Sequence, residues 1–264
     1  MAEIPETVVI TEKRKRRWPP GIPQILALIL VLIIDSLVSD NFFSIQIREG
    51  RLFGSPIDIL NRAAPVAILS LGMTLVIATG GIDLSVGAVM AISGATAVSM
   101  MVAGHSLPVV IGVALLSGLI CGLWNGLLVA ILKIQPFVAT LILMVAGRGI
   151  AQLITQGQIV TFDNPSLAWL GSGAFAGLPV PVWMTLLIAL LTGLLVRKTA
   201  LGLFLEATGI NLRAARNAGV NGAVIVIVAY VISGLCAAVA GIIVAADIRA
   251  ADANNAGLWL ELDA

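Results

Sequence analysis

The sequence contains 264 residues, of which 59% are apolar and 11% are charged. An average soluble domain is about 45–50% apolar and about 25% charged, so one buried core does not explain this excess. The net charge of +1 provides no basic surface for a nucleic acid. The composition argues against a soluble enzyme, a disordered chain and a nucleic-acid-binding protein, and it predicts helices that are solvated by lipid.

The first 21 residues form a polar tail that ends in a basic cluster. Residues 13–17 read Lys-Arg-Lys-Arg-Arg, and Trp18 and two prolines follow. The next apolar run contains Asp35 and lacks a cleavage site of small residues, which argues against a removed signal peptide. We therefore predict a cytoplasmic tail over 1–21, with Trp18 at the level of the lipid headgroups.

Seven apolar runs follow this tail. They cover residues 22–39, 57–79, 84–103, 108–132, 136–155, 181–197 and 223–246. Because about 20 residues of helix cross a hydrocarbon core, we predict an all-α polytopic membrane protein with about seven spans and one transmembrane domain over 22–264. The Gly-, Ser- and Pro-containing segment 156–180 predicts an external loop with a short interfacial helix.

The distribution of basic residues predicts the orientation. If the spans alternate, ten Lys and Arg residues fall on the side of the N-terminus and four on the other side. Cytoplasmic loops carry the excess of basic residues, so the N-terminus and segment 199–222 are predicted to be cytoplasmic.

One short polar segment, residues 78–87, separates the second and third runs without a hydrophilic loop. It reads Ala-Thr-Gly-Gly-Ile-Asp-Leu-Ser-Val-Gly, and its two glycines allow a tight turn. In one interpretation Asp83 caps the next helix by accepting from the N–H of Ser85 or Val86. In the other, the segment is a break in a helix at membrane depth, where Asp83 and Ser85 line a solute path.

Three further polar residues lie in or beside the spans: Asn125, Gln135 and Arg148. A charge at depth costs roughly 2.5–3.5 kcal/mol on insertion scales, so Arg148 must face protein or water. Amide, guanidinium and indole groups suit a polyol, so all three residues are candidates for a transport path. The alternative is that they hold helices together by hydrogen bonds.

Segment 199–222 predicts a compact pair of short helices with a surface for a partner. Asn211 is placed to cap the second helix, Ala214 and Ala215 favour its formation, and Gly219 is placed to end it. A solvated connector is the alternative. Elsewhere, Cys121 and Cys236 are predicted to be buried and unpaired, and His105 is predicted to be a loop residue and no metal ligand.

Several blocks of the sequence resemble one family. They are Asn61–Pro65 with Gly72–Gly87, Trp124–Gly126, Gln135–Leu141 and the pattern Gly209-x-Asn211-x-x-Ala214-Ala215-x-x-x-Gly219. Together they are similar to permease subunits of bacterial ABC sugar importers of the ribose, xylose and galactofuranose type. The resemblance runs in order over essentially the whole chain, and it is closest to galactofuranose permeases.

The resemblance implies a mechanism and a set of partners. A cytoplasmic ATP-binding subunit, a periplasmic sugar-binding protein and a second permease copy or paralogue are expected. The coupling to the ATP-binding subunit is expected to use Glu206, Gly209, Asn211, Ala214, Ala215 and Gly219. We expect no cofactor or metal on this chain, with ATP on the partner, because no lysine here completes a phosphate-binding loop.

Two expectations complete the sequence-based picture. Family chains continue beyond Leu260–Ala264 through further spans, so we expect this chain to lack the last spans of a full permease. The alternative functions are an ion-coupled secondary transporter or channel, and an intramembrane enzyme. The enzyme is disfavoured because His105 has no Ser or paired Asp at a plausible spacing.

Overall fold

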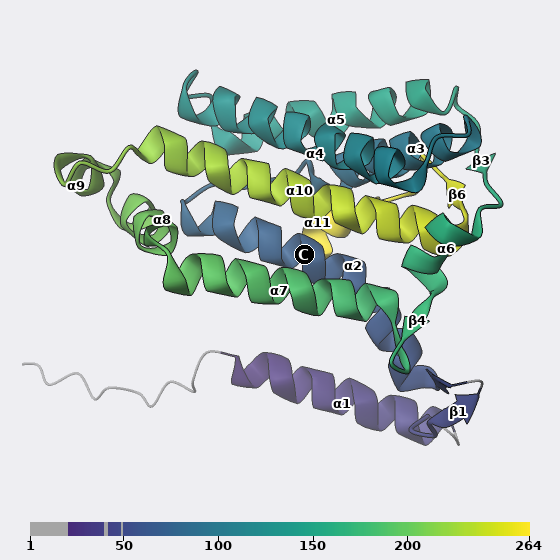
Figure 1. Ribbon diagram of the computed structural model, residues 1–264. Coiled ribbons are helices and arrows are strands. Elements are labelled where there is room, and N and C mark those ends of the chain that lie inside the picture. The colour runs from purple at the N-terminus through teal and green to yellow at the C-terminus, as the bar shows by residue number, and fades with distance from the viewer. Residues whose placement is uncertain (1–20, 40–41, 49) are drawn as a thin grey trace, which may run out of the picture. The chain divides into compact units, whose positions relative to one another are not determined.

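The computed structural model describes residues 21–39, 42–48 and 50–264, and these are mostly helical (Figure 1). The basic cluster and Trp18 of the predicted tail lie outside the described residues. The chain divides into two units, and the first, which ends at Ser44, contains α1 (Ile22–Val38). The second runs from Ile45 to Ala264 and contains every other described element.

Each of the seven predicted spans coincides with a helix, so the all-α prediction is confirmed. Besides α1 these are α2 (Ser55–Ala78), α3 (Val86–Val102), α4 (Leu107–Ala130), α5 (Pro136–Ile154), α7 (Val180–Lys198) and α10 (Gly222–Ile248). Five of them are long and apolar enough to cross a membrane. The helices α1 and α3 have 17 residues each, so the number of crossings stays a prediction.

Short elements connect these helices. They are the helices α6 (Pro165–Ser172), α8 (Ala200–Ile210), α9 (Leu212–Asn217) and α11 (Leu260–Asp263), and the strands β1 (Gln46–Arg48), β2 (Arg51–Phe53), β3 (Val160–Thr161), β4 (Ala174–Phe175), β5 (Leu178–Pro179) and β6 (Ala250–Ala251). The strands pair antiparallel as β1–β2, β3–β6 and β4–β5. The short helix predicted within 156–180 is α6, which Asn164 caps by accepting from two backbone N–H groups.

Proline marks the start of four long helices. Pro56, Pro108, Pro136 and Pro181 lie in the first turn of α2, α4, α5 and α7. A first-turn residue has no intrahelical partner for its N–H, so proline loses nothing there and its fixed φ suits the helix. The boundaries predicted from the sequence are accurate for this reason.

The central helix of the larger unit is α10, which packs on α2, α3 and α4 (Figure 1). Its crossing with α4 is close because glycines face each other. A Cβ on Gly118 would lie 2.4 Å from the carbonyl oxygen of Gly234, so no larger residue fits there without a shift. Small residues at such crossings let helix backbones approach and gain packing where lipid supplies no hydrophobic drive.

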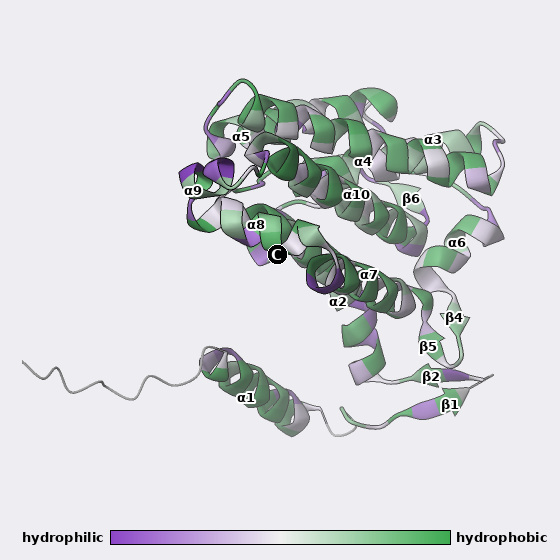
Figure 2. Ribbon diagram, turned by 60° about the vertical axis from the view of Figure 1, so that its left-hand side comes forward, coloured by the Kyte–Doolittle hydropathy of each residue, from purple (hydrophilic) through white to green (hydrophobic). Residues whose placement is uncertain are grey.

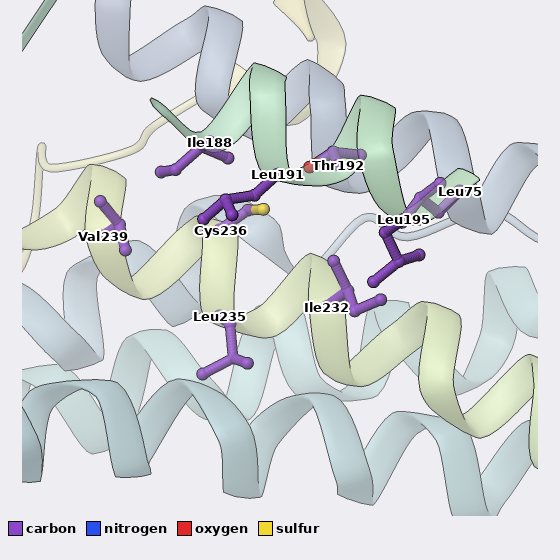
Figure 3. Close-up of a pocket in the computed structure, with 9 residues that line it drawn as sticks. All are labelled: Leu75, Ile188, Leu191, Thr192, Leu195, Ile232, Leu235, Cys236 and Val239. Atoms are coloured by element: carbon purple, nitrogen blue, oxygen red, sulfur yellow. The ribbon is translucent and has the colours of Figure 1, made fainter. Parts of the chain in front are cut away.

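The long helices are largely hydrophobic along their length (Figure 2), and many of their large apolar side chains are exposed. On α7, for example, Leu186, Leu187 and Leu190 are each more than half exposed. Figure 3 shows an apolar pocket of about 210 Å³. It is lined by Leu75 of α2, by Ile188, Leu191, Thr192 and Leu195 of α7, and by Ile232, Leu235, Cys236 and Val239 of α10. This lining suits hydrocarbon and offers little to a polar solute.

Candidate functional site

The link between α2 and α3 takes part in a buried network of polar side chains. The Oδ1 atom of Asp83 accepts from the backbone N–H of Ser85 at 3.0 Å and from its hydroxyl at 2.7 Å. The Nδ2 of Asn125, on α4, donates to the Ser85 hydroxyl oxygen at 2.8 Å. The predicted hydrogen bond from the N–H of Ser85 to Asp83 is therefore present, but the N-cap of α3 is Ser85, so Asp83 lies before the cap and does not form it. The structure brings together three of the five candidate path residues.

Residues of α10 and α5 complete this network. The hydroxyl of Ser233 donates to Oδ2 of Asp83 at 2.8 Å, and the hydroxyl of Tyr230 donates to the carbonyl of Ile82 at 3.0 Å. Thr140 of α5 also approaches that carbonyl, at 3.5 Å. Sequence reasoning missed these three residues, because a single Ser, Thr or Tyr within an apolar helix does not by itself indicate a site.

The network lies well inside the bundle. Ser233 is 11 residues into α10, which corresponds to about 16 Å at a rise of 1.5 Å per residue. Asp83, Ser85 and Asn125 are each at most 2% exposed. The link is thus irregular backbone inside the bundle, where protein groups satisfy the Ile82 carbonyl and the Asp83 carboxylate. The Oδ1 of Asn125, by contrast, is buried without a hydrogen-bond partner among the described residues. In this conformation the three side chains hold helices together and are shielded from any solute.

Gln135 lies apart from this network. It is exposed in the turn between α4 and α5, directly before Pro136. Because α4 and α10 run antiparallel, with Gly118 near Gly234 and Gly126 near Ile227, this turn lies at the α9 end of the bundle. Among the described residues, Gln135 makes no hydrogen bond to Asp83, Ser85 or Asn125.

Arg148 binds the chain segment that follows α10. Its Nη1 donates to the carbonyl oxygens of Ala253 at 3.2 Å and Ala256 at 2.5 Å. One turn further along α5, the Nε2 of Gln152 donates to Oδ1 of Asn254 at 2.7 Å. Arg148 thus contacts protein, as expected of a charge inside a span. Through these contacts Arg148 holds the segment 252–259 against α5.

The predicted pair of short helices is α8 and α9. The Oδ1 of Asn211 accepts from the N–H groups of Arg213 and Ala214 at 3.0 and 3.1 Å, so the predicted cap is present. Gly219 follows α9 with a φ of 87°, a left-handed conformation that favours glycine at a helix end. The exposed apolar residues of this pair are Leu203, Ile210 and Leu212.

Two small residues of this pair pack against the chain itself. Ala215 is only 5% exposed, so its methyl group supports the pair from inside and leaves the outer face to other residues. Gly209 lies against the end of α2, where a Cβ would come within 2.0 Å of the Ala78 carbonyl oxygen. Glu206 and Ala214 are exposed.

The remaining reactive residues do not form a site. Cys121 and Cys236 are buried and free, as predicted, and His105 is exposed in the turn between α3 and α4. Among the described residues, no group of three His, Cys, Asp or Glu side chains is placed to hold a metal ion.

Comparison with known proteins identifies relatives over nearly the whole chain. The family described as "Branched-chain amino acid transport system / permease component" matches residues 55–264. The galactofuranose transporter permease protein YtfT of Escherichia coli is 69% identical over 99% of this chain and 76% of its own length. The fructose import permease FruF of Bifidobacterium longum is 40% identical over 90% of this chain and 68% of its own length.

The relatives extend to other sugars. The ribose import permease RbsC of Haemophilus influenzae is 36% identical over 90% of this chain and 72% of its own length. No solved structure matches this chain.

The apolar helices and these relatives define a multi-pass inner-membrane transport subunit. The chain belongs to the family of permease components of ABC importers. Such permeases are non-enzymatic, because ATP is hydrolysed on a separate subunit of the importer.

Proposed function

We propose that this chain is the transmembrane subunit of an ABC importer that moves galactofuranose into the cytoplasm. The identity of 69% to a galactofuranose transporter permease, over 99% of the chain, carries the proposal. The buried polar link between α2 and α3 supports it, because helices interrupted inside the bundle are typical of transporters.

The importer then contains further subunits. A periplasmic sugar-binding protein delivers the sugar, a second permease copy or paralogue forms the other half of the pathway, and a cytoplasmic ATPase binds ATP. This chain binds no cofactor of its own. The ATPase biases the permease between its inward- and outward-facing states by binding them with different affinity.

The pair α8–α9 is the docking element for the ATPase in this proposal. Ile210 is 86% exposed and Leu212 is 56% exposed, and both lie where the two helices meet. Exposed apolar side chains beside the basic Arg213 and Arg216 suit a protein surface with an apolar groove and an acidic rim. The rim charges affect the association rate more than the affinity.

Docking is tested by purification of the ATPase with the permease. Ile210→Asp introduces a charge at the centre of the contact, so we expect the ATPase to be lost from the complex. Ile159→Asp is the matched control, because Ile159 is also exposed, at 62%, and lies in the turn after α5 at the other end of the bundle. Equal recovery of the ATPase with both variants would place docking elsewhere.

Transport is tested in cells that lack their own galactofuranose importer. Uptake of labelled galactofuranose is expected only when the permease, ATPase and binding protein are produced together. Uptake that persists without the ATPase, and that stops when the proton gradient collapses while ATP stays high, would support the ion-coupled alternative.

A further inference from the structure

The buried apolar side chains form two separate clusters among the described residues. The larger cluster joins α3, α4 and α5 to the middle of α2 and to α10 from Cys236 onward. The smaller cluster lies at the α9 end of the bundle, where it joins Leu205 of α8 to Leu75 and Val76 of α2 and to Tyr230 of α10 (Figure 1). The helix α8 is therefore packed on the ends of two long helices and does not hang from the bundle as a loose connector.

The backbone of α8 also touches the beginning of the link 79–85. A Cβ on Gly209 would collide with the carbonyl oxygen of Ala78 and would lie 3.6 Å from the Cα of Thr79. No flexible side chain separates the two backbones at this point. Because packed protein interiors have low compressibility, a shift of α8 must either displace the end of α2 or break this contact.

Tyr230 holds the link from the side of α10. Its side chain is fully buried in the smaller cluster, and its hydroxyl donates to the carbonyl oxygen of Ile82 at 3.0 Å. The same hydroxyl lies against Gly81, where a Cβ would come within 2.9 Å of the tyrosine oxygen. Tyr230 therefore connects the cluster that contains α8 to the backbone of the link.

The far end of the link belongs to the larger cluster. The helix α3 begins directly after Ser85, and Val86 and Val89 of its first turn are buried in that cluster. Asn125 of α4 holds Ser85 by the hydrogen bond described above. The link is thus a short irregular segment between two packed bodies, and such segments can absorb the changes in φ and ψ that a relative movement of the bodies requires.

We propose that Tyr230 is a positioning residue that transmits the movement of α8 to the link, and through the link to α3, when the ATPase acts on the permease. The movement passes from α8 through the smaller cluster and the tyrosine hydroxyl to the carbonyl of Ile82. The proposal rests on the proposed function of the chain and adds the residue through which docking of the ATPase affects the bundle. Tyr230 acts through the backbone of Ile82 and needs no contact with the sugar.

Tyr230→Phe removes this connection and little else. The phenylalanine ring keeps the apolar contacts of the smaller cluster, and the exposed face of α8 and α9 is unchanged. The Ile82 carbonyl keeps its approach to Thr140, at 3.5 Å, but loses its bond to α10. The variant therefore separates the hydrogen bond from the packing of the same side chain.

The test measures sugar uptake and ATP hydrolysis together, in proteoliposomes that contain the complete importer with ATPase and binding protein. The unmodified permease is compared with Tyr230→Phe and with the control Ser93→Ala. Ser93 is also fully buried, and among the described residues its hydroxyl donates only to Val89 and Met90 of its own helix. The control thus loses a buried hydroxyl that connects no two elements.

Tyr230→Phe is expected to lower the amount of sugar moved per ATP about fivefold, the factor that one ordinary hydrogen bond corresponds to. ATP hydrolysis and recovery of the bound ATPase are expected to stay close to those of the unmodified importer. Ser93→Ala is expected to keep the unmodified ratio of sugar to ATP. A merely structural role of Tyr230 would lower uptake and hydrolysis together, because fewer importers would be folded, and would leave their ratio unchanged.

A double variant tests whether α8 acts through Tyr230. If it does, Gly209→Ala combined with Tyr230→Phe lowers the ratio by less than the product of the two single effects, because both changes interrupt the same connection. An effect equal to the product would place the two residues on separate connections and contradict the proposal. If Gly209→Ala does not assemble, Leu205→Ala, which loosens the same helix in the smaller cluster, takes its place.

The remaining outcomes are also decisive. An unchanged ratio of sugar to ATP in Tyr230→Phe, with the unmodified importer active, would overturn the role of Tyr230 and leave the proposed function intact. Failure of the unmodified importer to move any sugar would overturn the proposed function and this role with it.

Discussion

At the scale of single residues, Asp83 combines one local contact with one distant contact. It accepts from the backbone of its own helix start, and it also joins α10 through Ser233. The first contact orders the turn that leads into α3, whose N-cap is Ser85, and the second joins this turn to α10. The first contact was predictable because Asp83 and Ser85 are two residues apart. Ser233 is 150 residues away, and no local pattern predicts contacts at that separation.

Asp83→Asn is expected to destabilise the permease. Asparagine presents one NH₂ group where aspartate presents a second acceptor, so the hydroxyl of Ser85 or Ser233 must accept in place of donating and its own proton loses its partner. A buried group left without its partner costs about 1–3 kcal/mol. The measurement is thermal unfolding in detergent, with Asp35→Asn on the separate helix α1 as the control. An unchanged unfolding temperature would show that these hydrogen bonds contribute little.

Arg148→Leu is expected to free the turn 252–259 and reduce transport, while the chain still inserts into the membrane. Leucine fills part of the same volume but donates no hydrogen bond to Ala253 or Ala256. The release is measured as faster labelling of a cysteine placed at Asn254, which is exposed in the segment that Arg148 holds. Arg148→Lys keeps the charge and is expected to be intermediate. Normal uptake by Arg148→Leu would show that Arg148 has only a structural role.

At the scale of elements, the long helices were predictable and the short ones only in part. Each long helix is an apolar run of about 17–25 residues bounded by proline, glycine or charge, which is a strong signal in a single sequence. The strands have two or three residues each, too short for a periodic pattern. The return of residues 252–259 into the bundle was also missed, because polar residues after a span usually indicate a surface loop.

Gly209→Ala is expected to separate ATPase binding from transport. The added methyl group collides with the Ala78 carbonyl, at the point where α8 touches the end of α2 and the link begins. The outer face of α8–α9 is unchanged, so the ATPase should still copurify and hydrolyse ATP, whereas uptake should fall. Ala214→Ser, a small change on the exposed side of α9, is the control. Loss of the bound ATPase from Gly209→Ala would show that the contact only supports the docking face.

At the scale of the whole molecule, the orientation in the membrane is a prediction from the distribution of basic residues, and it has a direct test. The native cysteines are replaced by alanine, and one new cysteine is placed at Ser166 in α6 or at Asn217 in α9, both of which are exposed. An impermeant thiol reagent added to cells should label the first position and spare the second, because basic residues mark the cytoplasmic side. The reverse pattern would invert the orientation. Ser166 is used because the neighbouring Gly171 is packed against α10.

The partnership of Asp83 with Ser233 also constrains how the protein is made. The two residues are 150 positions apart, and synthesis at about 5–20 residues per second separates their appearance by about 8–30 s. During that interval Asp83 has its own Ser85 but lacks its partner on α10. A partly satisfied carboxylate is unfavourable in lipid. We therefore expect the link to stay in contact with water or the insertion machinery until α10 has been synthesised. The hairpin of α2 and α3 should therefore be the last part of the bundle to reach its final packing, although it is among the first to be synthesised.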